Sequence, residues 1–179
     1  MKREIKHTGF TLVEILIVIV IMGISAAVML PLLGSNTGFQ LQAAMRDLNS
    51  IIQYTQNLAI TKQQKYQIVF DTIGNKFAVS DEAGNLIDDP GKTAPSGTTE
   101  PEKYKLRRLY GQNDNYSRVV LTSALFDGTA ILWFDSLGIP NSGDIEDNTP
   151  LASGTITLTA GNNTMTLKVE PVSGKITIE

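Results

Sequence analysis

An apolar run near the N-terminus constrains this 179-residue chain more than any other feature. The run covers residues 10–33, and Glu14 is its only charged residue. As an α-helix it would be about 36 Å long, which is enough to cross a hydrocarbon core of about 30 Å. Three basic residues lie within the first six positions, and such a flank remains on the cytoplasmic side of a membrane. The sequence therefore predicts one membrane-inserted helix with a cytoplasmic N-terminus.

Three kinds of segment have this composition: a helix that anchors a protein in the membrane, a cleavable secretory signal peptide, and a buried helix of a soluble protein. The buried helix is disfavoured because residues 15–24 are apolar on every side except at Gly23, whereas helices of soluble proteins usually keep a polar face. The signal peptide is a real rival, since Ser25, Ala26 and Ala27 are small residues at a suitable distance for cleavage.

Glu14 argues against both a signal peptide and a plain anchor. A carboxylate inside an apolar run costs about 3 kcal/mol on insertion scales, so an acid at this depth indicates a function and a partner. Neither a signal peptide nor a plain anchor helix needs such an acid. The alternative is that Glu14 lies near enough to the lipid headgroups to remain hydrated. Glu14 therefore favours a helix that stays attached to the protein and has a function beyond targeting or anchoring.

The string GFTLVE, from Gly9 to Glu14, followed by an apolar helix, resembles the processing motif of type IV prepilins and of the pseudopilins of type II secretion. The resemblance implies that a prepilin peptidase cleaves between Gly9 and Phe10 on the cytoplasmic side and methylates the new amine of Phe10. The apolar helix then stays attached, unlike a signal peptide. It also implies that Glu14 meets the N-terminal amine of a neighbouring subunit and helps to set the filament register. Residues four apart share a helix face, so Glu14 lies over the same face as Phe10.

Pro31 lies inside the apolar run, where it removes one backbone hydrogen bond and clashes with the preceding turn. We therefore expect the helix to kink or loosen there, with a broad break across residues 34–38. The alternative is simply the end of a membrane span before a linker. Between residues 39 and 61 apolar residues recur at helical spacing, which predicts an amphipathic helix with one face on a sheet.

After this helix the period of the apolar residues changes to two, which predicts strands. Residues 66–79 have the pattern of a hairpin with its turn at Gly74 and Asn75. Residues 88–103 are rich in Pro, Gly, Ser and Thr, which predicts a loop. Strand alternation should bury at least one of the neighbouring rings of Trp133 and Phe134. Further strands are expected at residues 119–126, 130–134, 155–159, 165–169 and 176–178.

Together with the resemblance, these elements predict an α+β, pilin-like fold. A long N-terminal α-helix is expected to pack its distal half on a C-terminal antiparallel β domain, built from two small sheets. The expected organisation is a cleaved leader peptide (1–9), a transmembrane and filament-core helix (10–33), an amphipathic continuation of that helix (34–63), and a periplasmic β-rich globular domain (64–179). The protein would be held in a bacterial inner membrane before assembly.

The C-terminal half carries a second resemblance. The string ILWFDSLGIPNSG, a Thr-rich strand, a turn at residues 161–163, a further strand and the ending SGKITIE are similar to H-type minor pseudopilins and to related minor pilins. This resemblance implies a structural subunit at the tip of a type II secretion pseudopilus, which assists export of folded proteins across the outer membrane. The alternative is a minor type IV pilin in pilus assembly or DNA uptake. The implied partners are the prepilin peptidase, other minor and major pseudopilins, an inner-membrane assembly platform and secreted substrates.

Composition disfavours catalysis and resident cofactors. The chain has no cysteine, and its one histidine, His7, lies in the segment that processing would remove. No nucleophile motif or glycine-rich phosphate loop is present, so we expect a structural protein without a cofactor. The acidic stretches 81–82, 88–89 and 144–147 lack the alternating ligand spacing of an EF-hand, so we expect no metal site.

One further cluster has a composition that suits single-stranded nucleic acid, because basic and aromatic residues alternate between residues 103 and 118. The overall net charge of −3 argues against a polyanionic partner, and removal of the basic leader would make the charge more negative. We therefore do not expect nucleic acid among the partners. The cluster consists of Lys103, Lys105, Arg107, Arg108 and Arg118 with Tyr104, Tyr110 and Tyr116.

Overall fold

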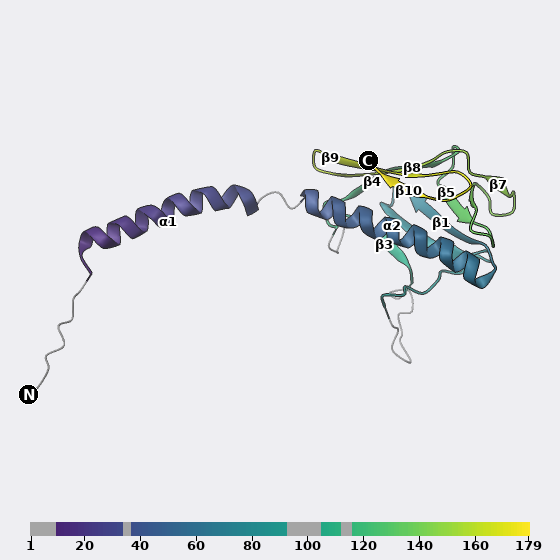
Figure 1. Ribbon diagram of the computed structural model, residues 1–179, viewed down its shortest axis with the longest axis horizontal. Helices are drawn as coiled ribbons and strands as arrows, with labels where there is room; N and C mark the ends of the chain where they lie inside the picture. Colours follow the sequence, from purple (N-terminus) through teal and green to yellow (C-terminus); the bar gives the residue numbers. More distant parts are fainter. Residues whose placement is uncertain (1–9, 34–36, 93–104, 112–115) are drawn as a thin grey trace, which may run out of the picture. The chain divides into compact units, whose positions relative to one another are not determined.

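A computed structural model of the chain describes residues 10–33, 37–92, 105–111 and 116–179 (Figure 1). The chain divides into two compact units, Met1–Asn36 and Thr37–Glu179. The described part of the first unit is a single helix, and the second unit holds one helix and all the strands. Every strand pair among these described residues is antiparallel, so the predicted α+β class with a long N-terminal helix is confirmed.

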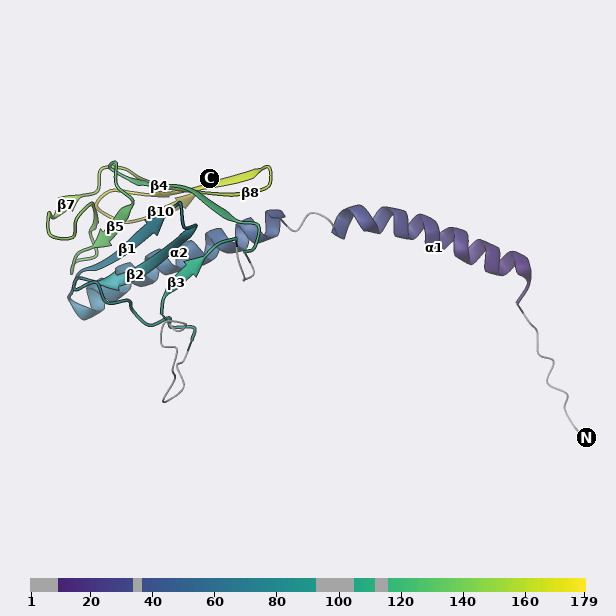
Figure 2. The same cartoon turned by 180° about the vertical axis from the view of Figure 1, so that it is seen from behind.

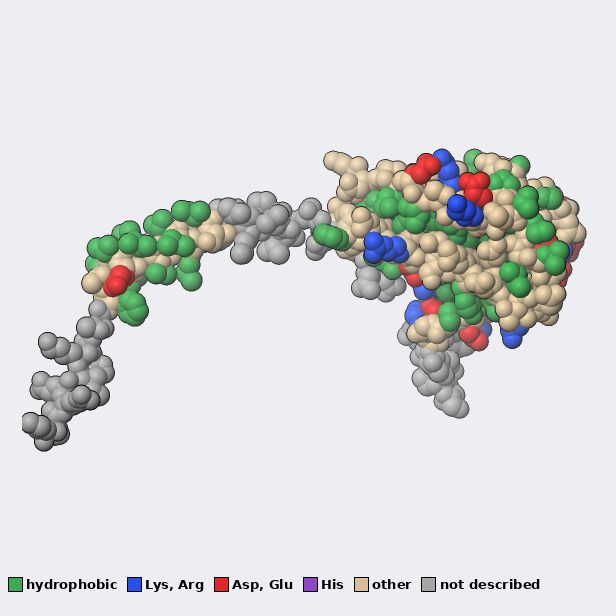
Figure 3. Space-filling view, viewed as in Figure 1, with side chains coloured by type: hydrophobic (Ala, Val, Ile, Leu, Met, Phe, Trp, Pro, Cys, Tyr) green, Lys and Arg blue, Asp and Glu red, His purple; other side chains and the backbone are tan. Residues whose placement is uncertain are grey.

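Helix α1 (Leu12–Leu33) occupies most of the predicted apolar helix. Its assignment runs through Pro31, so the kink expected there remains a prediction, and residues 34–36 lie outside the described residues. Figure 3 shows hydrophobic side chains along the described part of this helix, with one acidic side chain near its beginning. Within the parts of the chain that the structure describes, no helix combines the length and the hydropathy needed to cross a membrane.

Helix α2 (Thr37–Lys62) confirms the predicted amphipathic helix. Its buried side chains recur every three or four residues and face the strands, because that spacing places them on one side of a helix. Whether α2 continues α1 depends on residues 34–36, which lie outside the described residues, so the predicted continuation stays a prediction. The buried residues are Leu41, Ala44, Met45, Leu48, Ile51, Ile52, Thr55 and Ala59.

The larger sheet contains the predicted hairpin at its centre. Strands β1 and β2 pair in register so that Phe70 lies opposite Phe77, and β5 pairs with the other side of β1. Seen from behind, β1 and β2 lie in front of α2 (Figure 2). The described strands of this sheet have the order β3 (Arg107–Leu109), β2 (Lys76–Asp81), β1 (Tyr66–Asp71), β5 (Ile131–Phe134), β6 (Pro140–Ser142) and β7 (Thr149–Pro150).

The second sheet is built from the Thr-rich C-terminal strands together with one strand from the middle of the chain. Its order among the described residues is β10 (Ile176–Ile178), β9 (Asn163–Val169), β8 (Gly154–Ala160) and β4 (Val120–Phe126). The prediction of two small antiparallel sheets is thus confirmed. The predicted long strands of each sheet are also present. The short strands β3, β6 and β7 have too few alternating residues to be predicted from the sequence.

The hydrophobic core of the second unit lies between α2 and the two sheets. At its centre the rings of Phe77 and Phe126 lie 5.6 and 5.5 Å from the ring of Phe70. Both Trp133 and Phe134 are buried, which exceeds the prediction that at least one would be. Phe134 belongs to the main core, whereas Trp133 lies on the other face of β5 under the Lys65 ammonium, 5.0 Å from the ring centroid.

Candidate functional site

The N-terminal end of α1 is organised by two side chains, Thr11 and Glu14. The Thr11 backbone N–H and the Thr11 hydroxyl each donate to Glu14 Oε2 at 2.9 Å, and the Glu14 backbone N–H donates to Thr11 Oγ1 at 3.3 Å. This reciprocal pattern is a capping box, which satisfies backbone N–H groups that a helix start would otherwise leave without partners. The sequence analysis missed the role of Thr11, although the Thr-x-x-Glu spacing was a sufficient signal for it.

The same geometry leaves part of the Glu14 carboxylate accessible. Both hydrogen bonds from Thr11 go to Oε2, and Oε1 accepts no hydrogen bond from any described residue. Phe10, Glu14 and Val18 line one shallow groove along α1, as expected for residues spaced by four. The structure therefore brings Phe10 and Glu14 together on one side of the helix. Gly9 and the bond predicted to be cleaved lie outside the described residues.

The apolar side chains of α1 are strongly exposed within this single chain. The described large hydrophobic residues on this helix range in exposed fraction from 50% at Ile17 to 79% at Leu12, and Phe10, just before the helix, is 85% exposed. A continuous apolar surface of this kind is rare on soluble monomers and indicates a surface that lipid or another protein covers. Each of these side chains gains about 1.5 to 3 kcal/mol on complete burial. The helix thus has a strong driving force for insertion or association.

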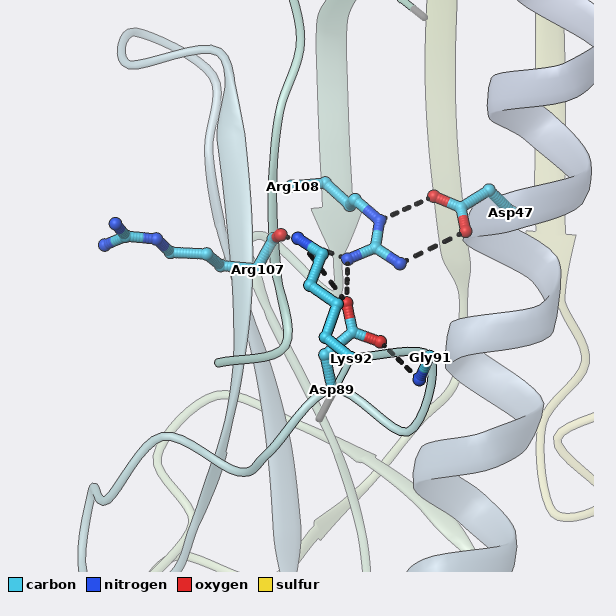
Figure 4. A network of polar contacts seen from close by, with 6 residues as sticks. All are labelled: Asp47, Asp89, Gly91, Lys92, Arg107 and Arg108. Atoms are coloured by element: carbon cyan, nitrogen blue, oxygen red, sulfur yellow. Dashed lines mark hydrogen bonds and ion pairs between the residues drawn. The ribbon is translucent and has the colours of Figure 1, made fainter. Parts of the chain in front are cut away.

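Within the globular unit, Arg108 on β3 forms a network of ion pairs with two carboxylates (Figure 4). Its Nε and Nη2 donate to the two oxygens of Asp47 on α2, at 2.8 and 3.4 Å, and its Nη1 donates to Asp89 at 2.8 Å. Asp89 also accepts from the Gly91 N–H at 3.0 Å. The network ties β3 and the segment after β2 to the middle of α2.

The network also sets the ionisation of Asp89. Burial of this side chain acts to raise the pKa of Asp89, but the Gly91 hydrogen bond and the Arg108 guanidinium outweigh it and hold the pKa below its usual value. The same carboxylates raise the pKa of Arg108 despite its own burial. Asp89 and Arg108 therefore form an ion pair in which both groups are charged at neutral pH.

Contacts within the globular unit engage several residues of the basic and aromatic cluster that was weighed for nucleic acid. Arg108 is committed to carboxylates, and Lys105 donates to Asp88 at 2.9 Å. Tyr110 is buried and packs edge-on against Tyr116, with ring centroids 5.9 Å apart. Binding of single strands needs accessible cations and exposed aromatic faces, which the paired Arg108 and the buried Tyr110 do not supply. Lys103 and Tyr104 lie outside the described residues.

The acidic stretches have local structural partners. Asp81 accepts from the backbone and the side chain of Asn85, and Asp144 accepts from the Glu146 N–H at 3.1 Å. Across the described ranges, no group of three or more acidic or histidine side chains is arranged to hold a metal ion. These carboxylates act in turns and ion pairs.

Comparison with protein families matches residues 6–30 to the prokaryotic N-terminal methylation motif. The predicted resemblance to type IV pilin-like proteins is confirmed over this segment. The methylation motif includes Gly9, Phe10, Thr11 and Glu14, so the capping box and the exposed apolar surface of α1 belong to it.

Two solved structures are similar to the chain, both of the type IV minor pilin FimU from Pseudomonas aeruginosa strain PAO1 in different crystal forms. The first has 16% sequence identity and a TM-score of 0.48, and the match covers 80% of this chain and 91% of that one. The second has 16% identity and a TM-score of 0.45, with coverage of 78% and 92%. No curated protein sequence matches the chain significantly. The similarity to type IV pilin-like proteins therefore rests on the methylation motif at residues 6–30.

Proposed function

We propose that this protein is a filament subunit made as a prepilin. The leader of residues 1–9 is removed by a prepilin peptidase between Gly9 and Phe10, and the new amine of Phe10 is methylated. The observation that carries this proposal is the apolar surface of α1, exposed on all its described large side chains and beginning beside a single acid within the methylation motif. A helix of this kind needs lipid before assembly and other subunits after it.

The proposed cycle begins in the bacterial inner membrane, with α1 in the bilayer and the globular unit in the periplasm. An assembly platform then moves the helix from lipid into a filament core. There Glu14 receives the amine of a neighbouring subunit, which cancels two charges in an apolar environment. Since Oε1 of Glu14 accepts no hydrogen bond from a described residue, the capping box and this intermolecular contact are compatible. No catalytic step is assigned to the chain.

Among filament subunits, we propose a minor pseudopilin at the tip of a type II secretion pseudopilus, which assists export of folded proteins. The resemblance of the sequence from residue 131 onward to H-type minor pseudopilins supports this choice. In the structure this stretch includes β5, a turn, β6 and the strands β8 to β10. The alternative is a minor type IV pilin of a pilus or a DNA-uptake filament. The pairing of Arg108 and Lys105 with carboxylates weighs against direct DNA contact.

Two measurements test this proposal. Mass spectrometry of the protein from its native host should find a methylated Phe10 at the N-terminus. An unprocessed Met1 or cleavage after residue 27 would reject the prepilin assignment. Deletion of the gene should then lower export of folded proteins to the medium while surface pili and DNA uptake remain. Loss of pili or of DNA uptake with normal export would favour the minor pilin instead.

A further inference from the structure

Trp133, the only tryptophan in the chain, is buried outside the main hydrophobic core. Its ring has no exposed surface, although it lies on the face of β5 opposite to that of Phe134. Its indole nitrogen Nε1 has no hydrogen-bond partner among the residues that the structure describes. A buried N–H without a partner costs free energy, because it has lost its hydrogen bond to water and made no other. The covered state of this ring is therefore less favourable than that of an ordinary core side chain.

Lys65 joins the Trp133 ring to the segment between β6 and β7. The Lys65 ammonium lies 5.0 Å from the centre of the ring and donates to the Ile145 carbonyl at 2.9 Å. An ion pair with Glu82 at 3.8 Å also holds this ammonium in place. We call residues 143–148 the strap. The strap therefore lies beside the face of the ring that Lys65 covers.

Few contacts attach the strap to the rest of the globular unit. Ile145 is its one buried side chain, and the residues on either side of it are exposed. Within the described ranges, the bond from Lys65 is the only hydrogen bond between residues 144–147 and a residue outside the strap. At the base of the strap, the Gly143 N–H donates to the Thr129 hydroxyl at 3.1 Å. One apolar and one polar contact therefore keep the strap closed above a fixed base.

The strap can move as a unit, because its other hydrogen bonds are internal. The Asp144 carboxylate accepts from the Glu146 N–H at 3.1 Å, and the Asp144 carbonyl accepts from the Asp147 N–H at 3.1 Å. Its two ends, Gly143 and Asn148, have φ of 77° and 45°, in the left-handed region that glycine and asparagine tolerate. A few loop residues of this kind can absorb the change of torsion angles at a hinge. Rotation about these ends leaves the turn inside the strap intact.

Opening of the strap has a limited cost in free energy. It exposes Ile145 and the Trp133 ring to water, which is unfavourable, but it also hydrates the indole N–H that is unsatisfied in the closed state. The main core stays packed, because neither of these two side chains belongs to it. Segments held by few buried contacts open locally at a free energy well below that of global unfolding.

We propose that the strap is a latched cover that opens locally and exposes Trp133 while the rest of the globular unit stays folded. Lys65 is the latch, since it contacts both the ring and the strap. The open state presents a large aromatic face with a polar N–H, and such side chains contribute strongly to contacts between proteins. The strap does not depend on the proposed role in a filament; it adds a conformational change to the globular unit.

Hydrogen exchange of the indole N–H, followed by NMR on the full-length protein in detergent micelles, tests this cover. The single tryptophan gives a single indole signal. We expect it to exchange at least about tenfold faster than the backbone N–H groups of β1, since local opening costs less than global unfolding. Its rate should change little in dilute urea, because opening of the strap exposes little surface.

Two results of this measurement would overturn the proposal. If the indole and the backbone of β1 exchange at the same rate throughout a urea series, the ring is exposed only by global unfolding. If the indole exchanges as fast as that of free tryptophan, the strap does not cover the ring.

The Lys65→Met variant tests the latch, and Lys62→Met is its matched control. Methionine retains an unbranched apolar side chain but removes the donor, so indole exchange should rise about tenfold while exchange in β1 stays at the parental rate. Lys62 is exposed at the end of α2, so its replacement should leave both rates unchanged. Ile145→Ala should raise the indole rate as Lys65→Met does, because it removes the buried side chain of the strap.

The latch would be rejected by an unchanged indole rate in Lys65→Met or in Ile145→Ala. It would also be rejected by an equal rise in β1, which indicates global destabilisation, or by an equal rise in Lys62→Met, which indicates a general effect of charge.

Discussion

Replacing Arg108 with methionine should destabilise the globular domain by about 3 kcal/mol at pH 7. The substitution removes the guanidinium from Asp89, which is only 4% exposed and keeps only the ammonium of Lys92 at 3.9 Å, and breaking a buried pair in this way costs about 3 to 5 kcal/mol. The lower end applies because the side chains of Arg108 and Asp47 keep 19% and 22% of their surface in solvent. For a domain of this size, such a loss lowers the midpoint of thermal unfolding by about 10 °C.

The pH dependence of this loss has a defined sign. In the parent, the folded pKa of Asp89 lies below its usual value, so its stabilising contribution is present above that usual value and is lost as the pH falls through the folded pKa. In the variant, only the half-exposed Lys92, 3.9 Å away, is left to offset the burial of the carboxylate, and protonation relieves the remaining cost. The difference between parent and variant should therefore be largest near pH 7 and should shrink toward pH 3.

Chemical denaturation of residues 37–179 at several pH values measures this difference. This segment contains the whole buried core, so it is the unit whose folding is tested. Lys168→Met is the matched control, because its pair with Glu179 is exposed on both sides and such pairs contribute about 0 to 1 kcal/mol. A loss below about 1 kcal/mol in Arg108→Met, or an equal loss at pH 3 and pH 7, would refute the reasoning.

Three further predictions concern single side chains. Asn75→Ala should lower the free energy of unfolding by about 1 to 3 kcal/mol, since the Asn75 side chain accepts from the Leu121 N–H at 2.7 Å and donates to the Val119 carbonyl at 3.2 Å. Urea midpoints measure this loss, and a variant as stable as the parent would contradict the prediction. Burial acts to raise the pKa of Asp127, but hydrogen bonds from residues 142, 152 and 153 outweigh it and keep this pKa below its usual value. Asp127→Asn should therefore lose stability above about pH 4 but little below it. Thermal midpoints measured across pH would reveal this difference. Glu14→Leu should still be inserted and cleaved but should be largely absent from filaments, and normal recovery in sheared filament fractions would exclude the proposed contact with a neighbouring amine.

The elements that local spacing specifies were predictable from the sequence. The apolar run, the methylation motif and the three- to four-residue spacing on α2 all depend on residues close together in the chain. The β1–β2 hairpin follows in the same way from alternation on both sides of a short turn. Even the capping box at Thr11 and Glu14 had a local signal, in residues three positions apart.

Contacts between distant segments depended on the tertiary structure. Sequence reasoning could only group Arg108 with neighbouring cations and reject nucleic acid from the net charge, whereas the fold places Arg108 against Asp47, 61 positions away. Gln56 likewise joins turns that lie 82 and 117 positions further along the chain. No periodicity encodes such pairings, because they arise when α2 packs against both sheets. The sequence by itself determined an apolar helix within a methylation motif and an α+β domain, whereas the fold decided which charged side chains form ion pairs, because those pairs join segments far apart in the chain.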